Sequence, residues 1–307
     1  MTFSRRKFLK YQLAAGLSLA GGLQGLRPFK ALASGSPDLA VVKGDIAPAC
    51  RAAVELLGGM SSVVSPGNKV VIKPNMSFDS PPERASNTHP EMIRTLVIMC
   101  REAGAARISV LDNPLRQAEL CLEASGMQQA LQGIEHCRVE QLDAPGRFRE
   151  VELPRGEQLH STEVMREVLE ADVLIAAPVA KHHSSAGVSL SMKGMMGLIL
   201  NRGIFHYRFD LHTAIVDLCT FLQPRLTVID CSRALTTNGP SGPGKVVHPQ
   251  TMVASRDMVA ADAFVTSMVQ WYGQSIPPRK VKHIRLAHER GLGRMDIANL
   301  SVRRISL

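Results

Sequence analysis

A histidine pair and two lysines follow a strongly apolar run and could together bind an anion or transfer a proton. The run ADVLIAAPV ends just before Lys181, His182 and His183, and Lys193 follows a patch of small residues. A lysine in partly apolar surroundings has a lowered pKa, which suits Schiff-base or nucleophilic chemistry, and histidine titrates near neutral pH. The small residues from Ser184 to Ser191 let backbone amides approach a phosphate or carboxylate. We therefore expect His183 and Lys193 to be catalytic; a solvated basic loop is the alternative.

Further polar side chains occur at the ends of other apolar runs. Asn75 follows KVVIKP, Asp112 ends RISVLD and Asp230 ends LTVID. Taken singly, Asn75 is explained as a turn former and the two aspartates as helix N-caps. Because ligands bind at the carboxyl ends of the strands in parallel α/β sheets, these groups together predict a cleft there. The residues expected to bind a ligand or cofactor are Lys73, Asn75, Asp112, Lys181 and Asp230.

Several common binding motifs are absent from the sequence. No two of the six cysteines are spaced as C-x-x-C, so there is neither an iron–sulfur motif nor a zinc ribbon. No G-x-G-x-x-G follows the first apolar run, and the loop GPSGPGK at 239–245 lacks the Ser or Thr that a phosphate loop needs after its lysine. The prolines of this loop predict a rigid segment near the cleft. Five histidines could converge on a metal, without any fixed spacing: His182, His183, His206, His212 and His248.

Short β-branched runs alternate with longer amphipathic segments along the chain. Strands are predicted at 39–44, 69–75, 107–113, 139–142, 172–179, 226–232 and 251–255, and helices at 49–59, 89–104, 162–170, 210–222, 257–273 and 280–290. The alternation predicts an α/β fold with a mostly parallel sheet and helices on both faces, Rossmann-like but without a dinucleotide fingerprint. We expect one α/β domain over 38–307, with a sub-division near 143–162 left open.

The first 33 residues are typical of an export signal. SRRKFLK, with Arg5 and Arg6, resembles the twin-arginine motif, and a glycine-rich apolar run at 13–26 and ALA at 31–33 follow it. The run is short and glycine-rich for a transmembrane helix; an uncleaved amphipathic anchor is the alternative. We therefore expect 1–33 to be a twin-arginine signal peptide, with the twin-arginine translocase as partner. The mature protein would be periplasmic or otherwise exported and would have no stable membrane span after cleavage.

The net charge of +9 is concentrated in the same segment. Residues 1–33 hold six basic residues and no acidic one, which leaves 30 basic and 27 acidic residues in the rest of the chain. A nearly neutral chain gives no electrostatic reason to bind nucleic acid. We therefore expect no nucleic-acid partner.

Blocks along nearly the whole mature chain resemble the family called domain of unknown function 362. They are VVIKPNM, THPEMIRTLVIMCREAGAARISVLDN, DVLIAAPVAKHHSSAGVSLSMKGMMGLI, LTVIDCSRALTTNGPSGPG and ASRDMVAADA. The family usually shows Lys-x-His and then Lys-Asn before a glycine, which Lys181, His183, Lys193 and Gly197 match, whereas Gly194 stands where asparagine is expected. The resemblance implies no established activity. Some members carry a ferredoxin-like segment, which this chain lacks.

A more distant resemblance is to the lactate racemase family. His183, Ala186-Gly187, Ser189 and Lys193 are similar to a histidine, Ala-Gly, serine and lysine pattern of that family, although Leu190-Ser191-Met192 replaces its glycine-rich approach to the lysine. The resemblance implies that His183 moves a proton and that Lys193 covalently holds a nickel-containing, nucleotide-derived cofactor. It adds Ser189 to the ligand-binding residues and His206 or His212 as a metal ligand.

These observations predict an exported protein with a cleft at the carboxyl ends of its strands. We expect the cleft to bind a small anionic ligand, a metal or a nucleotide-derived cofactor, with acid–base chemistry on a small acid. The alternatives are a non-catalytic periplasmic binding protein for an anionic small molecule, and a structural module in which Lys193 and His183 affect stability alone.

Overall fold

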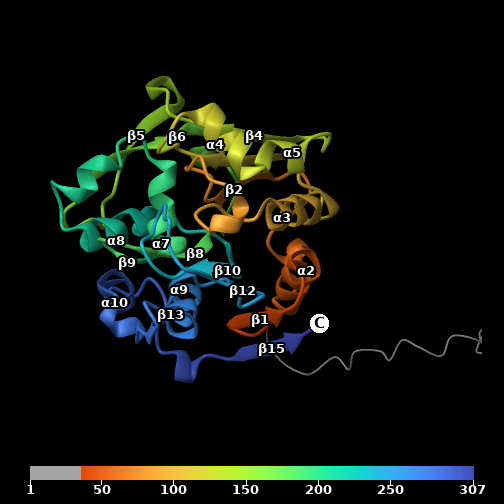
Figure 1. The fold of residues 1–307 in the computed structure, drawn as a ribbon. Coiled ribbons are helices and arrows are strands. Elements are labelled where there is room, and N and C mark those ends of the chain that lie inside the picture. Colours follow the sequence, from red (N-terminus) through yellow and green to blue (C-terminus); the bar gives the residue numbers. More distant parts are fainter. Residues whose placement is uncertain (1–35) are drawn as a thin grey trace, which may run out of the picture. The chain divides into compact units, whose positions relative to one another are not determined.

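A mostly parallel sheet forms the centre of the protein in the computed structural model, which describes residues 36–307 (Figure 1). Its main strands lie in the order β15-β1-β12-β10-β7-β2-β3-β4. β12 runs antiparallel to both of its neighbours, β1 and β10, and the other pairings in this order are parallel. The strands are β1 (Leu39–Lys43), β2 (Lys69–Pro74), β3 (Arg107–Asp112), β4 (Cys137–Gln141), β7 (Val173–Ala177), β10 (Leu226–Leu235), β12 (Thr251–Ser255) and β15 (Val302–Ser306).

Successive side chains of the central strands enter two different hydrophobic clusters. In β2, Val70 and Ile72 contact one cluster, whereas Val71 contacts the other. Both faces of the sheet are therefore covered, which explains why these strands read as continuous apolar runs. Burial of each such side chain contributes about 1.5–3 kcal/mol.

Helices cover both faces of the sheet, as the sequence predicted (Figure 1). α2 (Ile46–Leu56) and α3 (Pro90–Glu102) pack on one face, and their apolar residues belong to one cluster. The other face is covered by α7 (Ser191–Gly194), α8 (Leu211–Phe221), α9 (Met258–Met268) and α10 (Lys282–Glu289). The α/β fold with a mostly parallel sheet is thus confirmed.

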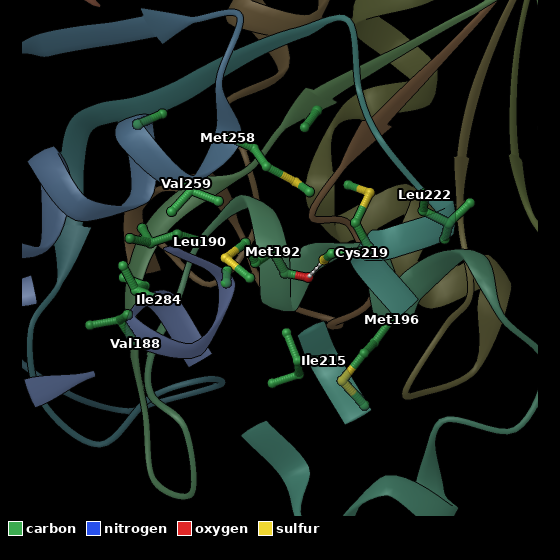
Figure 2. Packing of buried hydrophobic residues seen from close by; sticks show 14 of the residues in the cluster. Val188, Leu190, Met192, Met196, Ile215, Cys219, Leu222, Met258, Val259 and Ile284 are labelled. Carbon is green, nitrogen blue, oxygen red and sulfur yellow. Dashed lines mark hydrogen bonds between the residues drawn. The ribbon is translucent and has the colours of Figure 1, made fainter. Parts of the chain in front are cut away.

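The segment that carries Lys193 rests on the second of these helical layers. Figure 2 shows Met192 and Met196 packed among side chains of α8, α9 and α10, which include Cys219 and Ile284. The Cys219 thiol donates to the carbonyl of Met192 at 3.6 Å. The close packing holds the backbone on both sides of Lys193 against the core.

The chain after β7 differs from its predicted form. After Pro178 it continues as β8 (Val179–His183), which pairs in parallel with β10 beyond an irregularity and antiparallel with β9 (Gly187–Ser189). Lys181 and His183 therefore lie in a strand rather than in a loop.

The helix predicted at 162–170 is wrong. The structure has β6 (Ser161–Met165) there, paired with β5 (Phe148–Glu152), followed by the single turn α6 (Arg166–Leu169). The bridge between Val164 and Ile199 connects this hairpin to the rest of the chain. Strand pairing with distant residues therefore outweighed the helical spacing of apolar residues in the segment. Ser36–Leu307 forms one compact unit that includes the region near 143–162.

Short elements complete the described chain. They are α4 (Ala118–Ser125), α5 (Met127–Leu131), β11 (Val246–Val247), β13 (Gln270–Trp271), β14 (Gln274–Ser275) and the 3₁₀ helices η1 (Met60–Ser62), η2 (Pro82–Arg84), η3 (Pro145–Arg147), η4 (Met195–Leu198), η5 (Gly203–His206), η6 (Pro278–Lys280) and η7 (Ile297–Asn299). Among residues 36–307, no helix has the length and apolar character needed to cross a bilayer. The predicted signal at 1–33, with Arg5 and Arg6, lies outside the described residues.

Candidate functional site

A cavity of about 190 Å³ lies where β2, β3, β8 and β9 meet the segment of α7 and η4. Its wall includes eight of the residues singled out from the sequence: Lys73, Asn75, Asp112, Lys181, His183, Ser189, Lys193 and His206. Pro240 of the 239–245 loop also contributes to the wall. The carboxyl ends of the parallel strands thus bring these polar groups together.

The β8–β9 hairpin determines which of its side chains reach the cavity. Lys181 pairs with Ser189 and His183 with Gly187 across the hairpin. Because side chains alternate along a strand, Lys181 and His183 share one face and His182 points the opposite way. His182 instead contacts the ring of Tyr272 edge-on, with the ring centroids 4.9 Å apart.

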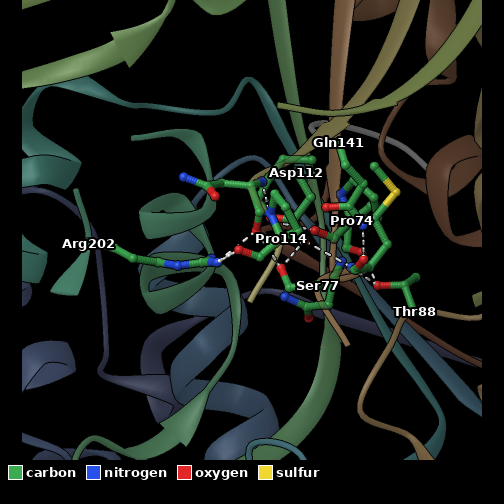
Figure 3. Close-up of polar contacts among 12 residues, drawn as sticks. Pro74, Ser77, Thr88, Asp112, Pro114, Gln141 and Arg202 are labelled. Carbon is green, nitrogen blue, oxygen red and sulfur yellow. Dashed lines mark hydrogen bonds and ion pairs between the residues drawn. The ribbon is translucent and has the colours of Figure 1, made fainter. Parts of the chain in front are cut away.

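Asp112 is the carboxylate of the cavity wall, and it is fully engaged by other groups. Its Oδ1 accepts from the Asn113 N–H at 2.9 Å and lies 3.1 Å from the ammonium of Lys73. Its Oδ2 accepts from the Met76 N–H at 2.9 Å and from the Ser77 hydroxyl at 2.7 Å (Figure 3). Burial lowers the pKa of Lys73, and the charge of Asp112 opposes this effect. The pair is therefore a structural part of the cavity floor.

Gly197 allows the Lys73–Asp112 pair to form. A Cβ atom at this position would overlap Oδ1 of Asp112 and would come within 2.9 Å of Nζ of Lys73. The glycine thus provides the space that two buried charged side chains need, which gives a physical reason for a glycine after Lys193.

Lys181 has its own partners inside the cavity wall. Its ammonium donates to the carbonyl of Ser86 at 2.5 Å and lies 4.9 Å from the centre of the Phe78 ring. Burial lowers its pKa to about 7, while the carboxylate of Asp112 acts in the opposite direction.

Lys193 differs from the other cations: no side-chain hydrogen bond or ion pair of its ammonium occurs among residues 36–307, and hydrogen bonding does not contribute to its pKa. The side chain is partly exposed and faces the cavity. Burial, followed by the nearby charges of Arg202 and Lys73, lowers its pKa to about 7. Close to neutral pH a large share of this amine is therefore unprotonated.

His183 is arranged as a hydrogen-bond donor. Its Nδ1 accepts from the N–H groups of Ser185 and Ala186, both at 3.2 Å. In a neutral imidazole with an accepting Nδ1, the proton lies on Nε2. Burial, then the charges of Lys193 and His206, lower the pKa of His183 to about 2. The ring therefore stays neutral and offers an N–H to the cavity.

Arg202 lines the cavity as well and was missed in the sequence. One of its guanidinium nitrogens, Nη2, donates to the carbonyls of Asn113 and Pro114 at 2.8 and 2.6 Å (Figure 3). Burial lowers its pKa and the charge of Asp112 opposes this effect. The sequence signal is an arginine that interrupts the apolar segment from Met195 to Phe205.

Asp230 and His212 do not reach the cavity. β10 continues five residues past Asp230, so this carboxylate is not at a strand end, and it accepts from His89, Ser232 and Arg233. His212, on α8, lies beside His283 of α10, with their Nδ1 atoms 3.3 Å apart. Both side chains support packing between elements.

The residues of the cavity do not fit the predicted metal or nucleotide-derived cofactor. Within residues 36–307 no three His, Cys, Asp or Glu side chains are grouped to hold a metal, and His206 lies in a different cluster from His212. A volume of about 190 Å³ is also below the roughly 300–1,000 Å³ of sites for drug-sized ligands.

Comparison with known proteins identifies relatives of this chain. The "Thylakoid-associated protein sll1697" of Synechocystis sp. (strain ATCC 27184 / PCC 6803 / Kazusa) is 26% identical over 243 residues, which cover 76% of this chain and 73% of that protein. A likeness in fold to the lactate racemase apoprotein from Thermoanaerobacterium thermosaccharolyticum has a TM-score of 0.48 and 14% identity, and covers 75% of this chain and 57% of the other.

A family model matches the central part of the chain. Residues 70–267, more than half of the chain, match the family described as "Domain of unknown function (DUF362)". This confirms the resemblance found in the sequence blocks, which include the segment of Lys181, His183 and Lys193. The chain belongs to this family, the domain of unknown function DUF362.

Proposed function

We propose that the cavity binds a small anionic molecule and that the protein is an enzyme acting on a small acid. The observation that carries the proposal is the imbalance between donors and acceptors. The carboxylate of Asp112 is already satisfied. Lys193, His183 and Ser189 line the cavity, and within the described part of the chain the ammonium, Nε2 and the hydroxyl of these residues make no hydrogen bond. A cavity rich in free donors and cations favours an anion.

The size of the cavity limits the ligand. At about 190 Å³ it suits an acid of a few carbon atoms or the anionic part of a larger molecule. Arg202 would hold the anion. The Asn113 and Pro114 carbonyls fix one nitrogen of its guanidinium, and the planar arrangement of its N–H groups matches a carboxylate.

Lys193 is the group best placed to transfer a proton. A pKa near the working pH makes an amine an efficient general acid and base. The neutral His183 would donate a hydrogen bond to a carbonyl or carboxylate oxygen and stabilise charge that develops there. Together these roles support proton transfer on a small acid.

Titration calorimetry with acetate, pyruvate, malonate, succinate and inorganic phosphate tests the binding. We expect at least one of these anions to bind, and Lys193→Ala to weaken it about tenfold or more, which corresponds to about 1.4 kcal/mol. Lys280→Ala, which removes an exposed lysine outside the cavity wall, is the control. Equal affinity in all three proteins would refute the assignment of the cavity.

Proton transfer is tested separately by NMR. The bound acid is incubated with the protein in D₂O, and deuterium should replace hydrogen next to the carboxylate in the wild type and not in Lys193→Ala. A ligand that binds tightly and never exchanges or reacts would instead make the protein a non-catalytic binding protein.

The proposal includes export by the twin-arginine route. It is supported by SRRKFLK at 4–10 and the small residues at 31–33. Replacement of Arg5 and Arg6 by lysine in the full chain should leave the protein in the cytoplasmic fraction. Unchanged fractionation of this variant would overturn the export proposal.

A further inference from the structure

Lys193 is distinguished from the other three cations of the cavity by its free amine. Lys73 is paired with Asp112, and Lys181 donates to the carbonyl of Ser86. Arg202 donates to two backbone carbonyls. Within residues 36–307, Lys193 alone of these four has no such contact. Three of the cations are therefore anchored to the protein, whereas the amine of Lys193 is not.

The surroundings of Lys193 favour its neutral form. Its backbone is packed into an apolar layer between the buried Met192 and Met196, and its nearest charged groups include Arg202 and Lys73. A lysine that is desolvated and placed beside other cations becomes a nucleophile, because its lone pair is free at neutral pH. Desolvation and these two cations lower its pKa to about 7, so that neutral amine is available near neutral pH.

The other groups of the cavity match a molecule with both a carboxylate and a carbonyl. Arg202 and the Asn75 amide offer donors for a carboxylate, because Asn75 uses only its Oδ1 inside the protein, as an acceptor from the Val179 N–H at 3.0 Å. His183 offers Nε2–H to a second oxygen. Because the cavity is small, a carbonyl that reaches Lys193 must lie close to the carboxylate.

We propose that Lys193 forms an imine with the carbonyl carbon of a small 2-oxo acid. The inference rests on the proposed binding of a small anion. The Nζ lone pair attacks the carbonyl carbon, a C–N bond forms, and the C=O π bond breaks while its oxygen takes up a proton. The nitrogen gives up one proton as the carbinolamine forms. The carbinolamine then loses its hydroxyl group and the remaining N–H proton as water to give C=N, so that amine and keto or aldehyde group yield imine and water without any redox change.

Borohydride trapping tests this step. The purified protein is incubated with glyoxylate, pyruvate or 2-oxobutyrate, reduced with sodium borohydride, digested and mapped by mass spectrometry. We expect the reduced adduct on Lys193, with at least a hundredfold lower yield on the exposed Lys245. Propionate, which has neither a keto nor an aldehyde group, should give no adduct. Trapping should increase as the pH is raised through about 7 and then level off.

The variant Lys193→Arg separates binding from chemistry. It keeps the positive charge but cannot form an imine, so the 2-oxo acid should still bind while the adduct is lost. Calorimetric binding of a 2-oxo acid to the wild type without any adduct on Lys193 would overturn this inference and leave the proposed anion site intact. Failure of every anion to bind would overturn both. Mass-spectrometric mapping of the reduced adduct in the wild-type protein tests the inference even if Lys193→Arg does not fold.

Discussion

The ammonium of Lys73 lies 3.1 Å from Oδ1 of Asp112, with only 2% and 1% of the two side chains exposed. Lys73 is on β2 and Asp112 ends β3, so this ion pair joins neighbouring strands at the point where both reach the cavity. Removing one partner would leave the other charge buried and uncompensated. Such a change costs more than replacing both partners together.

We predict that Lys73→Met destabilises the protein by about 3–5 kcal/mol. The double variant Lys73→Met/Asp112→Leu should lose less than the sum of the two single losses, because no buried charge is left alone. Urea unfolding of the wild type, Lys73→Met, Asp112→Leu and the double variant measures the coupling free energy between the two charges. Additive losses would show that the two charges do not depend on each other.

Substitution of Gly197 should disturb the same pair by steric means. The added methyl of Gly197→Ala overlaps Oδ1 of Asp112, and overpacking of this kind costs about 1–3 kcal/mol. Gly194→Ala is the matched control, since it lies three residues earlier, has φ −60° and has no atom within 4 Å of a new Cβ. It should be neutral or stabilise the protein by about 0.4–1 kcal/mol. Equal losses for both alanines, by thermal unfolding, would contradict this explanation.

Asp262 should fix the position of Lys193 through the backbone of the two preceding residues. Its carboxylate is buried in α9 and accepts from the N–H groups of Ser191 and Met192, both at 2.9 Å. In Asp262→Asn, the amide nitrogen would face one of these donors, with an expected cost of about 1–3 kcal/mol. We predict a weaker affinity for any anion that binds in the cavity.

Asp257→Asn is the control for Asp262→Asn. Asp257 caps the start of α9 by accepting from the N–H groups of Val259 and Ala260, and it also accepts from the Arg294 N–H. The variant Asp257→Asn should lower the stability of the protein by about 1 kcal/mol without a change in anion affinity. Calorimetry on both variants distinguishes a positioning role of Asp262 from general destabilisation.

The stability of the protein should fall in mild acid because of His283. Burial, then the neighbouring His212, lowers the pKa of His283 to about 3. The unfolded chain binds a proton at this residue below about pH 6.5 and the folded chain does not, so stability is lost from pH 6.5 down toward 3. Asp262 acts in the opposite direction, because burial raises its pKa to about 7.

The contribution of His283 is isolated by a difference between two proteins. We predict that His283→Gln loses less stability than the wild type when the pH is lowered from 7 to 4, measured as the change in unfolding temperature. His183 and Asp262 are the same in both proteins and cancel. An equal fall of the unfolding temperature in the wild type and in His283→Gln would show that His283 does not cause the acid sensitivity.

The sequence predicted the sheet and eight of the residues in the cavity wall, because both depend on local patterns. Buried strands of a parallel sheet are recognisable as β-branched runs, and their carboxyl ends must meet. Lys73, Asn75 and Asp112 follow directly from this rule. Lys181 and His183 were identified by their position after such a run, although they lie in a strand of their own.

Other parts of the site depend on tertiary contacts that no local pattern shows. Asp230 has the appearance of a strand-end residue, but β10 continues beyond it because β8 and β11 pair with its second half. Arg202 reaches the cavity from an irregular segment. Asp262 has a recognisable signal, a lone carboxylate in the apolar helix MVAADAFVTSM, yet its partners lie about seventy residues away and could not be inferred.

The 239–245 loop and the β8–β9 hairpin are in backbone contact at Gly239. A side chain at this position would collide with the carbonyl of His182, and the neighbouring Pro240 forms part of the cavity wall. Two segments that are far apart in the sequence are thus joined at a point with no room for a methyl group. Gly239 has no functional side chain, yet a larger residue at this position would separate the loop from the hairpin and alter which molecules can enter the cavity.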